Sequence, residues 1–159
     1  MIMRYEGASM KKKIVFHYDY ISQSKWATGY LKIGDNKFEF VCSYLFSDPL
    51  EDILASICQL LPGAVPYPRN YLTFTLLEEP EEYHWELHRV GKDEVNIKIH
   101  LKENDDGKLE LVYEELCDIK RLVVAIRKHL YSNKELLSNQ KVNPLYQDLQ
   151  KGIRYMKNI

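Results

Sequence analysis

Apolar and polar residues alternate along the first part of the chain, and this alternation predicts β-strands. In the segment 13–20, every second residue is Ile, Phe or Tyr, and the residues between them are mostly polar. The segment 26–46 alternates on both sides of a Gly-Asp-Asn turn signal, which predicts a β-hairpin. A two-residue turn at 35–36 would place Ile33 opposite Phe38 and keep apolar side chains on one face.

The pattern changes to a helical period over 47–63. Leu and Ile recur there at spacings of three and four, as on the buried face of an amphipathic helix. Asp48 is expected to cap this helix, with Pro49 at the first helical position and Glu51 completing a capping box. The Pro-Gly pair at 62–63 is expected to end it.

Alternation with a period of two returns after the helix. It predicts three or four more strands within 71–79, 83–88, 95–101 and 108–116. A three-residue loop at 91–93 would join the middle two strands as a hairpin. That loop pairs Trp85 with Ile99 and sets His84 opposite His100.

A helical period resumes at Leu116 and continues to about residue 130. A short helical turn at 132–139 and a last helix capped at Asn143-Pro144 follow. The order of elements predicts a single α+β domain over 10–159, with a largely antiparallel sheet of six to seven strands and two to three helices packed on one face. Residues 1–9 are expected to be a disordered extension.

Composition fits one domain with one core, since the chain has 159 residues and 45% of them are apolar. The net charge of −1 predicts neither a nucleic-acid nor a membrane partner. The charges are unevenly distributed, however. The segment 78–115 holds thirteen acids against five bases, and the segment 116–159 holds nine bases against three acids.

The three cysteines are widely spaced and odd in number, which fits a reducing compartment. Cys42 and Cys58 fall on apolar faces, where cysteine acts as a small hydrophobe. No segment has the length and apolar character of a membrane span or a signal peptide. The sequence therefore predicts a cytoplasmic protein.

An acidic cluster precedes the second hairpin. Glu78, Glu79, Glu81 and Glu82 surround Pro80, between two predicted strands. A pair of these carboxylates acting as general acid and base is not favoured, because four acids around a proline are typical of a solvated loop. The remaining alternatives are a plain surface loop and an acidic lip that attracts a basic partner.

Aromatic residues point to a second candidate surface. Trp26 and Tyr30 fall on the same predicted face as Lys32 and Glu39, opposite the face that carries Leu31. If helices cover only the Leu31 face, the other face would present Trp26 and Tyr30 for contact with a partner. The alternative is that both faces of the sheet are buried.

Histidines on the second hairpin raise the question of a metal or small-ligand site. His84, Glu86 and His88 share one strand face, and His100 lies opposite His84. Residues two apart on a strand are separated by roughly 6–7 Å, and Lys98 falls in the middle of the group. A solvated polar face explains the same residues, so no metal ligand is assigned.

Catalytic and nucleotide-binding motifs are absent from the sequence. It contains no G-x-S-x-G, no Walker loop and no G-x-G-x-x-G, and no cysteine lies near a histidine along the chain. We therefore expect neither a catalytic residue nor a cofactor. The basic residues near the C-terminus fit solvated helix faces better than nucleic-acid binding.

The segments WATGYLKIGDNKFEFVCSYLFSDPLEDILASICQLL and EEPEEYHWELHRVGKDEVNIKI resemble those of small uncharacterised bacterial proteins, some of which are similar to immunity proteins of polymorphic toxin systems. The resemblance covers about residues 13–130 and includes no chemical motif. It implies a non-enzymatic protein that binds and blocks a toxin. The sequence as a whole predicts a cytoplasmic protein-binding module, with a small-ligand or metal-binding domain on the His84/His88/His100 face as the alternative.

Overall fold

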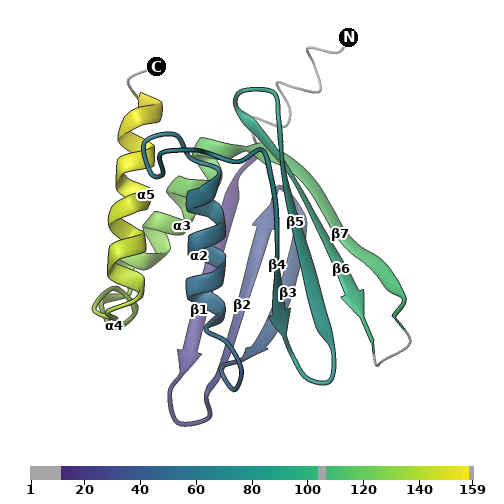
Figure 1. The fold of residues 1–159 in the computed structure, drawn as a ribbon. Helices are drawn as coiled ribbons and strands as arrows, with labels where there is room; N and C mark the ends of the chain where they lie inside the picture. Colours follow the sequence, from purple (N-terminus) through teal and green to yellow (C-terminus); the bar gives the residue numbers. More distant parts are fainter. Residues whose placement is uncertain (1–11, 104–106, 158–159) are drawn as a thin grey trace.

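The computed structural model describes residues 12–103 and 107–157, so the predicted extension at 1–9 lies outside the described residues. Within the described residues the chain forms seven strands and four helices (Figure 1). In order they are β1 (Ile14–Ile21), β2 (Trp26–Ile33), β3 (Asn36–Ser43), α2 (Pro49–Gln59), β4 (Tyr71–Leu77), β5 (Glu82–Val90), β6 (Glu94–Lys102), β7 (Leu109–Asp118), α3 (Ile119–Ser132), α4 (Lys134–Leu137) and α5 (Val142–Lys157).

The strands form two antiparallel sheets, β1-β2-β3 and β4-β5-β6-β7. The α+β class is confirmed, but the prediction of one sheet of six to seven strands is wrong. β3 packs against the second sheet through side chains and does not pair with it. The Phe38 ring lies 5.7 Å from the Trp85 ring on β5 and 5.8 Å from the Tyr113 ring on β7. The Tyr113 hydroxyl also donates to the backbone carbonyl of Asn36, at 3.1 Å.

The helices form two layers, where the sequence predicted one layer on a sheet face. α3 packs along β1 and α2 packs along β4, whereas α5 packs on α2 and α3 (Figure 1). Gly152 allows α5 to pack closely against Leu61, which follows α2, because a Cβ atom at position 152 would lie 2.9 Å from the Leu61 side chain. The described helices include none that is long and apolar enough to cross a membrane.

The core lies where the two sheets and the two inner helices meet. The buried apolar residues form one cluster that draws on both sheets and all the longer helices. Its centre is lined by Phe16, Leu31, Ile53, Trp85, Ile97 and Leu122. The stability of the fold therefore depends on contacts between segments that are far apart in sequence.

The first hairpin has the predicted faces but a different register. Ile33 lies opposite Asn36, and Phe38 lies opposite Leu31, so the predicted register is displaced by two residues. The two-residue turn consists of Gly34 and Asp35. Gly34 has φ +61°, a conformation that glycine adopts readily, as at the first central position of a type II′ turn. A shift of two residues leaves each side chain on its predicted face.

The second hairpin agrees with prediction, and the first helix starts as predicted but ends at Gln59, before the Pro-Gly pair that was expected to end it. Trp85 lies opposite Ile99, and His84 lies opposite His100. Asp48 accepts a hydrogen bond from the Glu51 amide at 3.1 Å, as expected of an N-cap. β7 continues beyond its predicted end at 116, because it is Asp118 that caps α3.

Candidate functional site

The acidic segment forms the tight turn between β4 and β5. The amides of Glu78 and Glu79 both donate to the Glu81 carbonyl, at 2.9 and 3.1 Å, and the Glu79–Pro80 peptide is cis. These two bonds hold the four glutamates at one tight turn. Glu79 is exposed, and the other three glutamates are half-buried.

Tyr83 lies close enough to several carboxylates for them to raise its pKa. Burial raises the pKa of Tyr83 to about 12, with further contributions from Glu78, which also accepts a hydrogen bond from the hydroxyl, and from Glu81 and Glu103. Glu103 directly follows β6, so the end of that strand also contributes to the cluster. We call Glu78, Glu79, Glu81, Glu82 and Glu103 the acidic end.

The charge of the acidic end is largely uncompensated within the described residues. Glu78, Glu79 and Glu81 form no ion pair there, and Glu82 has only His84, whose Nε2 lies 3.1 Å from a Glu82 carboxylate oxygen. That pair does not have hydrogen-bond geometry. The negative charge of the acidic end is therefore left for solvent or a partner to balance.

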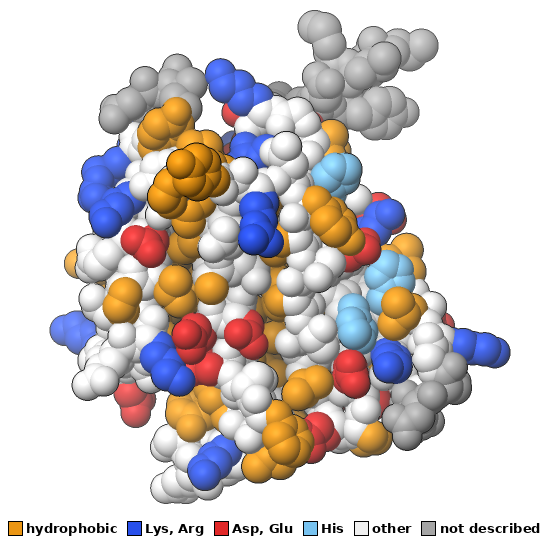
Figure 2. All heavy atoms as spheres, in the orientation of Figure 1, with side chains coloured by type: hydrophobic (Ala, Val, Ile, Leu, Met, Phe, Trp, Pro, Cys, Tyr) orange, Lys and Arg blue, Asp and Glu red, His pale blue; other side chains and the backbone are white. Residues whose placement is uncertain are grey.

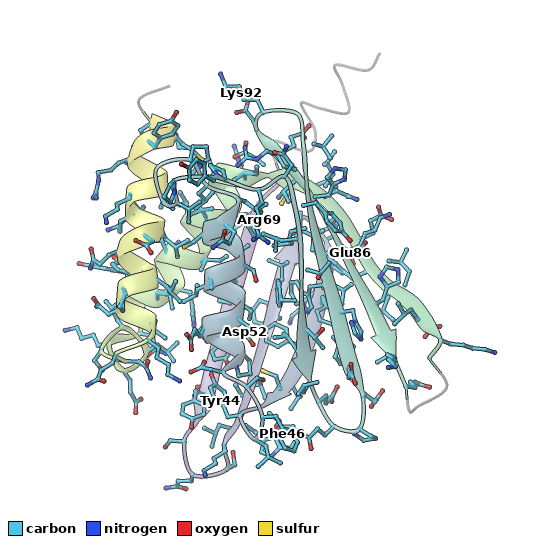
Figure 3. The ribbon with its side chains drawn as sticks, in the orientation of Figure 1. Tyr44, Phe46, Asp52, Arg69, Glu86 and Lys92 are labelled. Atoms are coloured by element: carbon cyan, nitrogen blue, oxygen red, sulfur yellow. The ribbon has the colours of Figure 1, made fainter. Side chains whose placement is uncertain are left out.

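The loop after β3 places two apolar side chains at the same end of the molecule. Leu45 is 63% exposed and Phe46 is 72% exposed. Figure 3 shows Phe46 at the lower end of the fold, where β4 ends, and Figure 2 shows hydrophobic and acidic side chains side by side there. β3 and β4 are in contact. The carboxylates of Asp48, which follows β3, and Glu78, which follows β4, both raise the pKa of the Cys42 thiol on β3. We call Leu45 and Phe46 the apolar knob.

The base of the knob is fixed by buried hydroxyl groups. Tyr44 bonds to the Tyr18 hydroxyl, which also lies 3.9 Å from the Cys42 sulfur. The Tyr44 ring lies 4.4 Å from the Tyr20 ring. Burial raises the pKa of both Tyr18 and Tyr44 well above the usual range, so neither ionises near neutral pH. Tyr44, the residue before the knob, is thus anchored to β1.

Trp26 and Tyr30 lie on the outer face of the first sheet, and both are half-buried. Trp26 is opposite Ser43, close to the start of the loop that carries the apolar knob. Tyr30 lies farther along β2. Its ring stacks on His17 at 5.4 Å, and the Lys37 ammonium lies 4.3 Å from its centroid. The structure therefore brings Trp26, but not Tyr30, to the end of the molecule that bears the knob.

The histidine face of the second sheet is arranged as the register predicts, with Glu86 opposite Lys98. His84 Nδ1 lies 3.3 Å from the Thr75 hydroxyl, and Glu86 accepts a hydrogen bond from Tyr71 at 2.9 Å. Among the described residues, no three His, Cys, Asp or Glu side chains are placed to hold a metal ion.

The three cysteines are free and buried. Burial raises the pKa of Cys42, Cys58 and Cys117 to about 12 in each case. A thiol with such a pKa is protonated near neutral pH and is a poor nucleophile. The geometry thus offers no support for cysteine chemistry.

One histidine ties α3 to the edge of the first sheet. His129 Nε2 lies 2.8 Å from the carbonyl oxygen and 3.0 Å from the amide nitrogen of Tyr18, and its ring packs 4.8 Å from that of His17. Burial lowers the pKa of His129. The Tyr18 backbone bond raises it, His17 lowers it further, and Asp19 raises it.

This lowered pKa predicts a pH dependence of stability. In the unfolded chain His129 takes up a proton below about pH 6.5, while the folded state resists protonation. The unfolded state then binds more protons, so the free energy of unfolding should fall between about pH 7 and about pH 5. In His129→Gln, which has no proton to take up, urea unfolding should show a shallower fall. An identical pH slope in both proteins would contradict this role.

The protein is thus an α+β domain of two antiparallel sheets. The acidic end and the apolar knob lie together at one end of it. Comparison with known proteins found no matching family model, no matching curated protein and no matching solved structure. The resemblance to immunity proteins therefore stays a prediction.

Proposed function

We propose that the protein is a non-enzymatic binding module whose acidic end and apolar knob together take a basic partner protein. An immunity-type inhibitor of a basic toxin would work in this way. The observation that carries the proposal is the position of Phe46, 72% exposed, at the end of the molecule where Glu78, Glu79 and Glu81 form no ion pair within the described residues and Glu82 has only His84.

The two features serve different parts of binding. An exposed aromatic side chain is typical of an interface anchor, because it buries much apolar area and loses little conformational entropy. The surrounding carboxylates would steer a basic surface toward the anchor and reject acidic ones. A partner's Lys or Arg side chains would also balance the negative charge of the acidic end.

The outer face of the first sheet is the second candidate surface. Trp26 supports it, because this side chain is half-buried and lies opposite Ser43, next to the loop of the knob. Tyr30 supports it less, since its ring already contacts His17 and Lys37. Trp26→Ala separates the two surfaces: unchanged partner affinity would restrict the interface to the knob and the acidic end.

Replacing Phe46 is expected to weaken partner binding without changing the fold. Phe46→Ser should raise the Kd by about thirtyfold, the effect of losing an interface anchor worth about 2 kcal/mol. The control is Tyr67→Ser, which removes an aromatic side chain that is 88% exposed on another loop. The partner is first isolated on immobilised wild-type protein. Titration calorimetry with this partner then measures the Kd of each variant. A Kd for Phe46→Ser within twofold of wild type, or an equal loss in Tyr67→Ser, would remove Phe46 from the interface.

A further inference from the structure

A basic groove runs between α3 and the edge strand β1. Two adjoining hollows, of about 470 and 380 Å³, share the residues Lys13, Ile14, Ala125 and Lys128 as walls. One hollow is lined by residues at the start of α3, and the other is lined by residues near its end and by β1. Figure 1 shows where α3 and β1 lie in the fold. The polar side chains of the groove include Lys13, His17, Lys120, Lys128 and Ser132, and Tyr30 adds an aromatic ring.

The charge of this groove is almost entirely positive. The single acid in its lining is Asp118, which is 8% exposed and accepts a hydrogen bond from the Arg121 amide as the helix cap. Within the described residues, Lys13, Lys120 and Lys128 form no ion pair. Three amines thus line one groove whose single carboxylate, that of Asp118, is already engaged as the cap of α3.

The composition of α3 departs from that of a merely solvated helix. The helix contains five basic side chains and no acid, so it has no acid–base pair at the spacing of four that stabilises exposed helices. Lys120 and Arg121 also stand in the first turn, where cations oppose the helix dipole. The helix thus lacks stabilising acid–base pairs and has cations where they oppose its dipole. Positive charge at such a cost to stability is expected to serve binding on this face.

We propose that this groove binds a small ligand carrying two or more phosphate groups. Its side chains offer ammonium, imidazole and hydroxyl donors, which suit the oxygens of phosphate. Lys120 and Lys128 are eight residues apart, about 12 Å along the helix, so a ligand with phosphates at both ends of this span can contact both side chains. The Tyr30 ring is engaged by His17 and Lys37, so the groove favours phosphates over stacked bases.

This inference does not rest on the proposed function. The groove lies between α3 and β1 and is basic, whereas the proposed partner surface is acidic and lies at the end of β4. Loss of one binding activity would therefore leave the other intact, and the two proposals fail separately.

Titration calorimetry with tripolyphosphate at about 50 mM salt tests the groove. Wild-type protein should bind with one site, and the double variant Lys13→Gln/Lys128→Gln should raise the Kd at least about tenfold, since bonds to charged groups are lost. Raising the salt to about 200 mM should weaken wild-type binding. The control Lys92→Gln/Lys134→Gln removes the same charge from exposed positions outside the groove and should bind within twofold of wild type.

Three outcomes would overturn the proposal. The first is the absence of saturable binding by wild-type protein. The second is an equal loss of affinity in the two double variants, which would indicate nonspecific charge attraction. In the third, a single-stranded oligonucleotide or an anionic lipid vesicle binds at least about tenfold tighter than tripolyphosphate, which would assign the groove to that macromolecular source of phosphate.

Discussion

Neutralising the acidic end should remove most of the affinity for a basic partner. In Glu79→Gln/Glu81→Gln/Glu82→Gln, the Kd is expected to rise by about ten- to a hundredfold, because three carboxylates at one turn lose their charge while the turn keeps its shape. Most of the loss should appear in the association rate, and the dependence of that rate on salt should become weaker. Surface plasmon resonance at two salt concentrations measures both effects.

A matched variant separates this local effect from the change in net charge. Asp35→Asn/Asp93→Asn/Glu135→Gln removes the same three negative charges from exposed positions in other parts of the fold. It should bind with nearly the wild-type association rate. If both triple variants slow association equally, the partner responds to overall charge and not to the acidic end. If neither does, electrostatic steering by this turn is excluded.

Removing the indole of Trp85 should cause the largest loss of stability in the protein. The side chain is 4% exposed, and its ring packs against Phe38, Phe40 and Phe74, so it joins the first sheet to the second. Trp85→Ala is expected to lower the free energy of unfolding by about 3–5 kcal/mol, through lost burial and the cavity left behind. Urea unfolding followed by far-UV circular dichroism measures this.

The second tryptophan provides the control for Trp85. Trp26 is half-buried on the outer face of the first sheet, so Trp26→Ala should cost well under half as much. Trp85→Phe keeps an aromatic ring and removes an indole N–H that has no hydrogen-bond partner among the described residues. It should therefore cost less than about 1.5 kcal/mol. Equal losses for the two alanine variants would contradict the assignment of inner and outer faces.

Local signals were enough to predict several elements correctly. The α2 helix was predicted because Asp48, Pro49 and Glu51 fix its start, and each acts within one turn of the chain. The β5–β6 register was predicted because the loop at 91–93 and the alternation leave one pairing with Trp85 opposite Ile99. In both cases the deciding interactions lie between residues that are close in sequence.

Two features were predicted wrongly, one that depends on distant contacts and one that depends on a turn. The division into two sheets follows from the packing of Phe38 on Trp85 and Tyr113, which no local pattern encodes. The register of the first hairpin was displaced because turns at 34–35 and at 35–36 put the same side chains on the same faces. The preference of Gly34 for positive φ decides between them.

The candidate site was predicted only in part. The four glutamates around Pro80 stand out in the sequence, whereas the apolar knob was taken for the end of a strand. The strand in fact stops at Ser43, whose side chain accepts a hydrogen bond from the Leu45 amide at 3.0 Å. The succession of Tyr44, Leu45 and Phe46, three apolar residues without alternation, was the available signal.

Comparative affinity capture tests the central claim most directly. Immobilised wild-type protein, the acidic-end triple variant, Phe46→Ser and the matched triple variant are exposed to lysate of the source cell, and bound proteins are quantified by mass spectrometry. We predict one stoichiometric basic protein that is retained by wild type and the matched variant and lost from the acidic-end variant and Phe46→Ser. Equal retention by all four proteins, or no stoichiometric partner on wild type, would contradict the proposed binding function.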